Sequence, residues 1–131
     1  MFLQIDPGDA APIYGQISRQ IQFAVASGTL GPGDRVPSVR ELARRLAVNP
    51  NTVARAYREL QALGILDAQR GLGLVVAPGA VDTCRDQRGR WIRERLAQVV
   101  GEALRAKVSA RQIQSILQDV IQTLSRQESS S

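Results

Sequence analysis

Two helix starts in close succession constrain the fold of this chain more than any other feature of its sequence. Ser38 is followed three residues later by Glu41, the spacing of a capping box, in which each side chain satisfies a backbone N–H at the helix start. Asn49 is a good N-cap, and Pro50 suits the first helical position, where no N–H is needed. Residues 36–63 therefore predict two short helices joined by a tight turn, as in a helix-turn-helix.

Both helices carry apolar residues at helical spacing along one side. The side chains off this stripe face solvent or a partner, and the alternative to a binding surface is an ordinary helical hairpin with a solvated basic face. The predicted buried residues are Val39, Leu42, Ala43 and Leu46 in the first helix, and Val53, Ala56, Tyr57, Leu60 and Leu63 in the second. The residues off the stripe are Arg40, Arg44 and Arg45, then Asn51, Thr52, Arg55 and Arg58.

A third helix is expected to precede this pair, beginning at Pro12 and ending near Gly28, with apolar residues spaced to bury one face. Residues 28–35 are rich in glycine and proline and form a loop, with a brief strand at residues 35–36. The N-terminal residues form a short arm that packs on the domain or on its partner. The predicted buried face comprises Ile13, Ile17, Ile21, Ala24 and Val25, and the arm carries Phe2, Leu3 and Ile5.

Two short strands are predicted after the second motif helix, which ends at Gly64. Residues 65–70 and 74–77 flank the turn at residues 71–73, so they pair as a β-hairpin that Pro78 ends. A hairpin directly behind a helix-turn-helix is a wing. Arg70 lies at its tip, where it can enter a minor groove or contact a phosphate. The alternative is an exposed arginine on a turn, with no binding role.

Residues 12–76 resemble the winged-helix domain of GntR-type bacterial transcription regulators. The segments PIYGQI, SGTLGPGDRVPSVRELA, NPNTVARAYRELQALG and RGLG occur in the order and at the spacing of that family. The resemblance covers about half of the chain and is specific. Within the family, the segment NPNTVARAYREL is most similar to the YtrA-like branch, whose members have a short helical extension in place of a large metabolite-binding domain.

The resemblance implies which residues contact DNA. Asparagine and arginine at the start of the second motif helix can make bidentate contacts to adenine and guanine edges, and the helix N-terminus attracts phosphates. Pro50 departs from relatives that carry a long basic residue there, so the operator sequence is expected to differ from theirs. The implied DNA-binding residues are Arg40, Asn49, Asn51, Thr52, Arg55, Arg70 and Gly71.

The tail predicts two more helices, one capped by Asp82 and one opened by a capping box of Ser109 and Gln112. Their apolar stripes are too large to leave in water, so a second copy of the chain is expected to cover them, and the alternative is that they fold back on their own winged domain. The predicted dimerisation residues are Trp91, Leu96, Val99 and Val100, then Ile113, Ile116, Leu117, Val120, Ile121 and Leu124.

Composition excludes several functional classes. With no histidine and one cysteine, the chain cannot form a His/Cys zinc site or a Ser-His-Asp triad, and it has no glycine-rich phosphate loop. No enzyme activity, metal or cofactor is therefore expected. The single Cys84 allows no intrachain disulfide and is expected to be a plain helix residue, the alternative being a redox sensor. No apolar run approaches the roughly 20 residues of a membrane span, so a cytoplasmic location is expected.

The net charge of +5 is consistent with nucleic-acid binding, and all cations but Lys107 are arginines. The expected fold is mainly α with a small β-hairpin: an arm (1–11), a winged helix-turn-helix (12–79) and a helical dimerisation extension (80–131). The expected function is a homodimeric repressor on a pseudo-palindromic DNA operator. The resemblance to the YtrA-like branch implies that the regulated genes include the protein's own operon and a neighbouring ABC transporter. The alternatives are a repressor with a small-molecule site in its tail and a winged-helix module that contacts protein or RNA.

Overall fold

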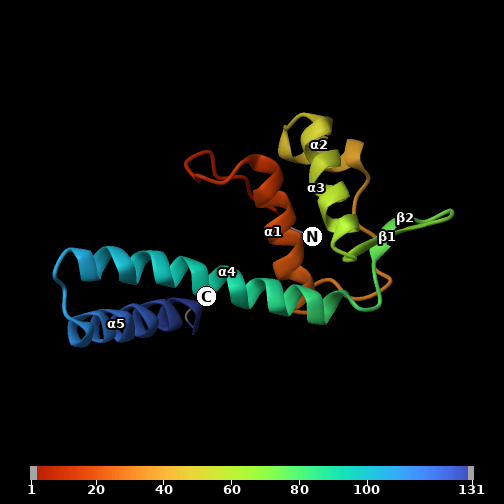
Figure 1. The fold of residues 1–131 in the computed structure, drawn as a ribbon. Helices are drawn as coiled ribbons and strands as arrows, with labels where there is room; N and C mark the ends of the chain where they lie inside the picture. Colours follow the sequence, from red (N-terminus) through yellow and green to blue (C-terminus); the bar gives the residue numbers. More distant parts are fainter. Residues whose placement is uncertain (1–2, 130–131) are drawn as a thin grey trace. The chain divides into compact units, whose positions relative to one another are not determined.

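The computed structural model describes residues 3–129 and confirms a mainly helical chain with one β-hairpin (Figure 1). Residues 1–2 of the predicted arm, including Phe2, and residues 130–131 of the predicted extension lie outside the described residues. The chain forms two compact units, Met1–Gly89 and Arg90–Ser131. The elements are α1 (Ile13–Ala26), α2 (Val39–Leu46), α3 (Pro50–Ala62), β1 (Leu66–Gln69), β2 (Gly73–Val76), α4 (Ala80–Arg105) and α5 (Ala110–Ser129).

The two helix starts of the motif are confirmed. The Ser38 hydroxyl accepts the backbone N–H of Glu41 at 3.1 Å, and the Asn49 side chain accepts that of Asn51 at 2.8 Å. The Glu41 carboxylate pairs with Arg45, four residues further along α2. Ala47 ends α2 with a left-handed φ of 55°, which reverses the chain before α3 begins. Local capping chemistry therefore fixes the spacing of α2 and α3.

The core of the first unit lies where α3 packs against both α1 and α2. Most of the predicted buried positions are buried, but two at helix ends are wrong. Leu63 is 37% exposed because α3 ends at Ala62, and the chain turns at Gly64 so that Ile65 occupies the core instead. Ile13 is 39% exposed because it is the first residue of α1.

The predicted wing is an antiparallel hairpin in which Leu66 pairs with Val76 and Gln69 with Gly73. The brief strand predicted at residues 35–36 is confirmed as an isolated bridge between Arg35 and Val75. It ties the wing to the loop before α2, because the Val36 N–H donates to the Leu74 carbonyl at 3.1 Å. The wing is therefore fixed at its base, and only its turn extends from the unit (Figure 1).

The N-terminal arm lies against α1 and is held there by two glutamine side chains. Leu3 is buried in the core. The buried Gln16 amide accepts the backbone N–H of Asp6 at 2.8 Å and donates to the carbonyls of Asp6 and Ala11, both at 3.0 Å. One helical turn later, Gln20 bonds to the N–H and the carbonyl of Gln4. The two side-chain amides thus satisfy backbone N–H and C=O groups of the arm that have no partner strand.

Replacing Gln16 by leucine is expected to lower the free energy of unfolding by about 2 kcal/mol, because three hydrogen bonds are lost at a buried position. The change is measured by urea denaturation. The matched control is Gln20→Leu, whose two bonds to Gln4 are exposed, so that water replaces them at a cost below about 1 kcal/mol. Equal losses in the two variants would contradict this account of the arm.

The tail departs from expectation at the start of α4. The helix begins at Ala80, so Asp82 lies in its first turn and the prediction that Asp82 caps it is wrong. The reason is that the Ala77 N–H donates to Ile65 and the Ala80 N–H to Ala77, which starts the helix directly after the wing. Within residues 3–129, no helix has the length and apolar character of a membrane span.

The capping box at the start of α5 is confirmed. The Ser109 N–H donates to the Gln112 side chain at 3.1 Å, and the Gln112 N–H donates to the Ser109 hydroxyl at 3.2 Å. α5 runs antiparallel to the C-terminal part of α4 (Figure 1). No residue of α5 is buried. The second unit therefore has no apolar core of its own along this helix.

Candidate DNA interface

The residues expected to read DNA gather at the N-terminal end of α3. Asn49, Asn51 and Arg55 are exposed and Thr52 is half-buried. Asn51 and Arg55 are four residues apart and Thr52 and Arg55 three apart, so all three lie on one side of the helix. The fully buried Val53 and Ala56 lie on the other side. One edge of α3 is thus anchored in the core and the other presents a row of polar groups.

The two asparagines of this row are not equivalent. The side-chain oxygen of Asn49 is engaged by the N–H of Asn51, because Asn49 caps the helix. A bidentate contact to adenine needs an amide oxygen and an amide nitrogen together. Asn51 is therefore the better candidate for reading a base, and Asn49 is left with its NH₂ group to donate to a phosphate or a base.

Arg55 makes a contact that the sequence did not predict. Its guanidinium carbon lies 3.8 Å from the centroid of the Tyr14 ring, which belongs to α1. A cation over an aromatic face at this distance is attracted by the electron-rich ring. Tyr14 is not among the predicted site residues. No local pattern joins positions 14 and 55, and only the packing of α1 on α3 brings them together.

Arginines of α2 add exposed positive charge beside α3. Arg40 and Arg44 are exposed, and Arg45 is exposed but paired with Glu41. α2 packs against α3, so this charge and the polar row belong to the same rigid unit. Arg40 is thus exposed on a helix that packs directly against the one carrying the polar row.

The wing turn carries the remaining two predicted residues. Arg70 and Gly71 are exposed, and Gly71 has a φ of +81°, which L side chains rarely adopt, so glycine is required there. Leu72, at 47% exposed, completes the turn. The backbone at this point therefore has no side chain to prevent close approach to a ligand.

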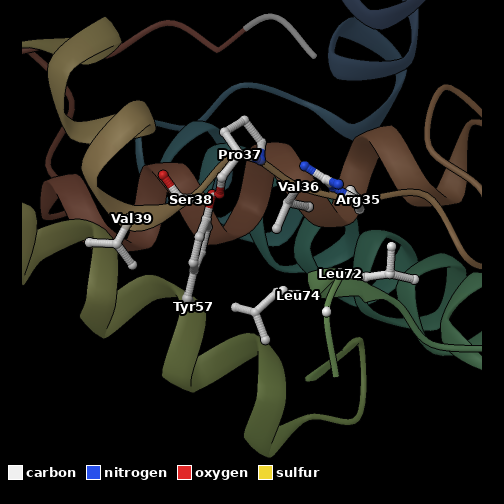
Figure 2. Close-up of a pocket in the computed structure, with 10 residues that line it drawn as sticks. Arg35, Val36, Pro37, Ser38, Val39, Tyr57, Leu72 and Leu74 are labelled. Atoms are coloured by element: carbon white, nitrogen blue, oxygen red, sulfur yellow. Dashed lines mark hydrogen bonds between the residues drawn. The ribbon is translucent and has the colours of Figure 1, made fainter. Parts of the chain in front are cut away.

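A groove of about 420 Å³ separates the wing from the start of α2 (Figure 2). The Tyr57 hydroxyl donates to the Pro37 carbonyl at 2.7 Å, and burial raises the pKa of this hydroxyl above its ordinary value. The exposed Arg35 was not among the predicted site residues. The groove is lined by Arg35, Val36, Pro37, Ser38, Val39, Tyr57 and residues 71–74. The wing turn and α2 thus border one continuous surface.

Cys84 lies in α4 and is fully buried. Desolvation by burial raises the pKa of its thiol to about 11, so little thiolate is present at neutral pH. This favours the plain structural role that the sequence suggested. Among the described residues, no cluster of three or more Asp, Glu, Cys or His side chains is arranged to hold a metal ion.

Comparison with known proteins identifies the family of this chain. The family of bacterial regulatory proteins named gntR matches residues 13–76. The transcriptional repressor YtrA of Bacillus subtilis is 37% identical over 118 residues, which cover 90% of this chain and 91% of the repressor. The prediction that the chain is not an enzyme is confirmed, because these relatives are transcription regulators.

Solved structures extend the likeness to the fold. A GntR family regulator from Listeria monocytogenes superimposes with a TM-score of 0.71 at 30% identity, covering 88% of this chain and 98% of that one. The DNA-binding domain of AraR, solved in complex with its operator ORX1, has a TM-score of 0.50 at 27% identity and covers 57% of this chain and 93% of that one. The chain therefore belongs to the GntR family of bacterial transcription regulators, and its likeness to YtrA along nearly the whole length confirms the YtrA-like branch.

Proposed function

We propose that this DNA-binding regulator is a cytoplasmic homodimeric repressor, which occupies a pseudo-palindromic operator with α3 in the major groove. The observation that carries this proposal is the row of Asn51, Thr52 and Arg55 on the exposed side of a helix whose other side is fully buried. A helix anchored in this way presents its polar side to base edges at a fixed angle. The complex of AraR with its operator supports the same use of the shared fold.

Each predicted site residue has a role in this proposal. Asn51 and Arg55 contact bases, and Thr52 contacts either a phosphate or a thymine methyl. Arg40 and Asn49 contact phosphates, which set the register of the protein on the duplex. The wing residues Arg70 and Gly71 approach the adjacent minor groove or its phosphates.

We assign one role to each of the three segments predicted from the sequence. We assign residues 12–79 to DNA binding, residues 80–131 to dimerisation and residues 1–11 to an arm that braces α1. The likeness to the YtrA repressor favours repression over activation. The branch resemblance extends the proposed targets to the chain's own operon and a neighbouring ABC transporter.

The dimer is supported by apolar surface that the single chain leaves uncovered. Ile113, Leu117, Val120 and Leu124 follow one another at intervals of four, three and four residues, which is the spacing of a coiled-coil seam. The α4 series Ile92, Leu96, Val99 and Ala103 has the same intervals. The exposed large apolar side chains of this unit include Ile92, Leu96, Val99 and Leu104, with Ile116, Leu117, Val120, Ile121 and Leu124.

Two such hairpins can bury both series against each other as a four-helix bundle. Ile113 of the α5 series is half-buried already, as are the predicted dimerisation residues Trp91 and Val100. An exposed apolar surface of this extent marks an interaction site in a water-soluble protein. Because identical surfaces meet in a two-fold dimer, each copy covers the other. The dimer also presents two copies of α3, as a pseudo-palindrome requires.

Selection of bound sites from random DNA duplexes tests this function directly. The expected result is an enriched inverted repeat whose half-site centres are about 10 base pairs, or a multiple of one duplex turn, apart. Affinity for the selected site is expected to exceed that for random duplex by at least about 1,000-fold at physiological salt. Enrichment of no sequence, together with equal affinity for all duplexes, would instead point to a winged-helix module that does not read DNA.

A further inference from the structure

The stack of Arg55 on Tyr14 joins a proposed base-reading side chain to a helix that carries none of the proposed DNA contacts. The guanidinium carbon of Arg55 lies 3.8 Å from the centroid of the tyrosine ring. We infer that Tyr14 is a positioning residue, which holds Arg55 in the orientation that reads its base and so sets specificity at that base pair. The inference rests on the proposed function, since it deepens the role given there to Arg55.

The geometry of stacking leaves Arg55 able to bind DNA. An aromatic ring attracts the face of the guanidinium plane, whereas the N–H donors of arginine lie in that plane and point outward from its edge. The bidentate contact to guanine uses two of these edge donors. In such a face-to-face arrangement, which the 3.8 Å distance permits, the ring restricts the rotamers of Arg55 without occupying the groups that recognise the base. A pre-organised fork loses less rotamer freedom when it binds.

Tyr14 is itself held in place by the core of the first unit. It is half-buried on the first turn of α1, beside Ile17, which is fully buried, and Gln16, which is 4% exposed. Gln16 bonds to the arm at Asp6 and Ala11, so this turn is fixed from two directions. Tyr14 itself packs against the core cluster, so it is held more firmly than the exposed Arg55 that it orients.

A simpler reading is that the stack only helps α1 to pack on α3. The two readings differ in what they predict for base discrimination. A packing contact affects affinity for every duplex alike, because it changes the amount of folded protein. A positioning contact affects only the base pair that Arg55 reads, and its effect disappears when Arg55 is absent.

The test is a double-mutant cycle with Tyr14→Leu, Arg55→Ala and the combined variant, and with Tyr14→Phe as the control that keeps the ring. Each protein is titrated with the selected operator and with the same duplex changed symmetrically at the base pair whose discrimination Arg55→Ala abolishes. Tyr14→Leu is expected to weaken operator binding about 10-fold, from loss of the stack in both copies, and to reduce discrimination at that pair. Tyr14→Phe retains both, and in the Arg55→Ala background Tyr14→Leu has no further effect.

Two further measurements separate loss of the contact between Tyr14 and Arg55 from loss of folded protein. Thermal melting establishes that each variant is folded, and Tyr14→Met replaces Tyr14→Leu if the latter does not fold. In NMR spectra, the Arg55 side-chain protons are expected to show an upfield ring-current shift in the wild type and in Tyr14→Phe, and to lose it in Tyr14→Leu.

Two outcomes overturn the inference. If Tyr14→Leu weakens both duplexes equally, or acts equally in the Arg55→Ala background, Tyr14 has only a structural role and the proposed function stands. If Arg55→Ala abolishes discrimination at no base pair, the base-reading role of Arg55 fails, and the inference about Tyr14 fails with it. Discrimination that falls in Tyr14→Leu and returns in Tyr14→Phe supports the positioning role.

Discussion

Replacing Arg55 by alanine is expected to weaken binding to the selected operator by at least about 30-fold and to leave binding to random duplex nearly unchanged. One bidentate contact between arginine and guanine contributes about 1–3 kcal/mol of discrimination. A dimer makes the contact twice, so the loss is about 2–6 kcal/mol, and each 1.4 kcal/mol corresponds to a factor of about ten in affinity. Arg55 is exposed, so its removal leaves the apolar core intact.

Fluorescence anisotropy with both duplexes at one fixed salt concentration measures this loss. The matched control is Arg111→Ala, which removes the same charge from an exposed position in α5. The control is expected to bind both duplexes almost as the wild type does, because Arg111 lies in the extension that we assign to dimerisation and is not among the proposed DNA contacts. If the two variants lost the same affinity for both duplexes, Arg55 would act as a general charge and not as a base contact.

Much of the fold could be predicted from the sequence because it is specified by local chemistry. The side chains of Ser38, Asn49 and Ser109 each accept a backbone N–H within three residues, so the signal for each helix start is contained in a few letters. The periodic apolar residues of α1, α2 and α3 then identify the buried faces. Such signals need no knowledge of the rest of the chain.

The errors lie where local signals stop. Periodicity continues through Leu63, although α3 ends at Ala62 and the turn at Gly64 places Ile65 in the core instead. Asp82 is a good capping residue in isolation, but backbone bonds after the wing start α4 at Ala80. Backbone bonds decide both boundaries: the Ile65 N–H donates to Leu60 at the end of α3, and the Ala77 N–H donates to Ile65 before α4. The periodicity of apolar residues does not reveal these bonds.

In the candidate site too, features set by local sequence could be predicted and features set by contacts between distant segments could not. The polar row of α3 could be identified from its position off the apolar stripe, and Arg70 from its place at the hairpin turn. The family resemblance added Gly71. The stack of Tyr14 on Arg55 and the place of Arg35 beside the groove could not be predicted, since each depends on elements distant in sequence. The bonds from Gln16 to the arm were missed for a similar reason: a glutamine in an amphipathic helix looks like any solvated residue.

Replacing Leu117 by aspartate is expected to convert the dimer to a monomer and to abolish selective operator binding. Leu117 lies in the middle of the α5 seam and is 41% exposed in the single chain. Only this exposed share is buried on dimerisation, so its loss costs about 0.6–1.2 kcal/mol per copy and weakens dimerisation about 10-fold. Burial of an unpaired carboxylate in each copy makes the loss much larger. The winged unit should remain folded, because no residue of α5 is buried in its own chain.

Ser115→Asp is the matched control for this change, because it adds the same charge to the same helix at an exposed position away from the seam. Sedimentation velocity measures the mass of each variant, and anisotropy measures binding to a whole operator and to a single half-site. Leu117→Asp is expected to sediment as a monomer and to bind whole and half operators with nearly equal, weak affinity, while Ser115→Asp behaves as the wild type. A Leu117→Asp protein that remained dimeric would mean that the apolar seam of α5 does not join the two copies. Loss of pairing with undiminished operator binding would mean that one winged unit alone supplies the affinity, so that the symmetry of the operator would need another explanation.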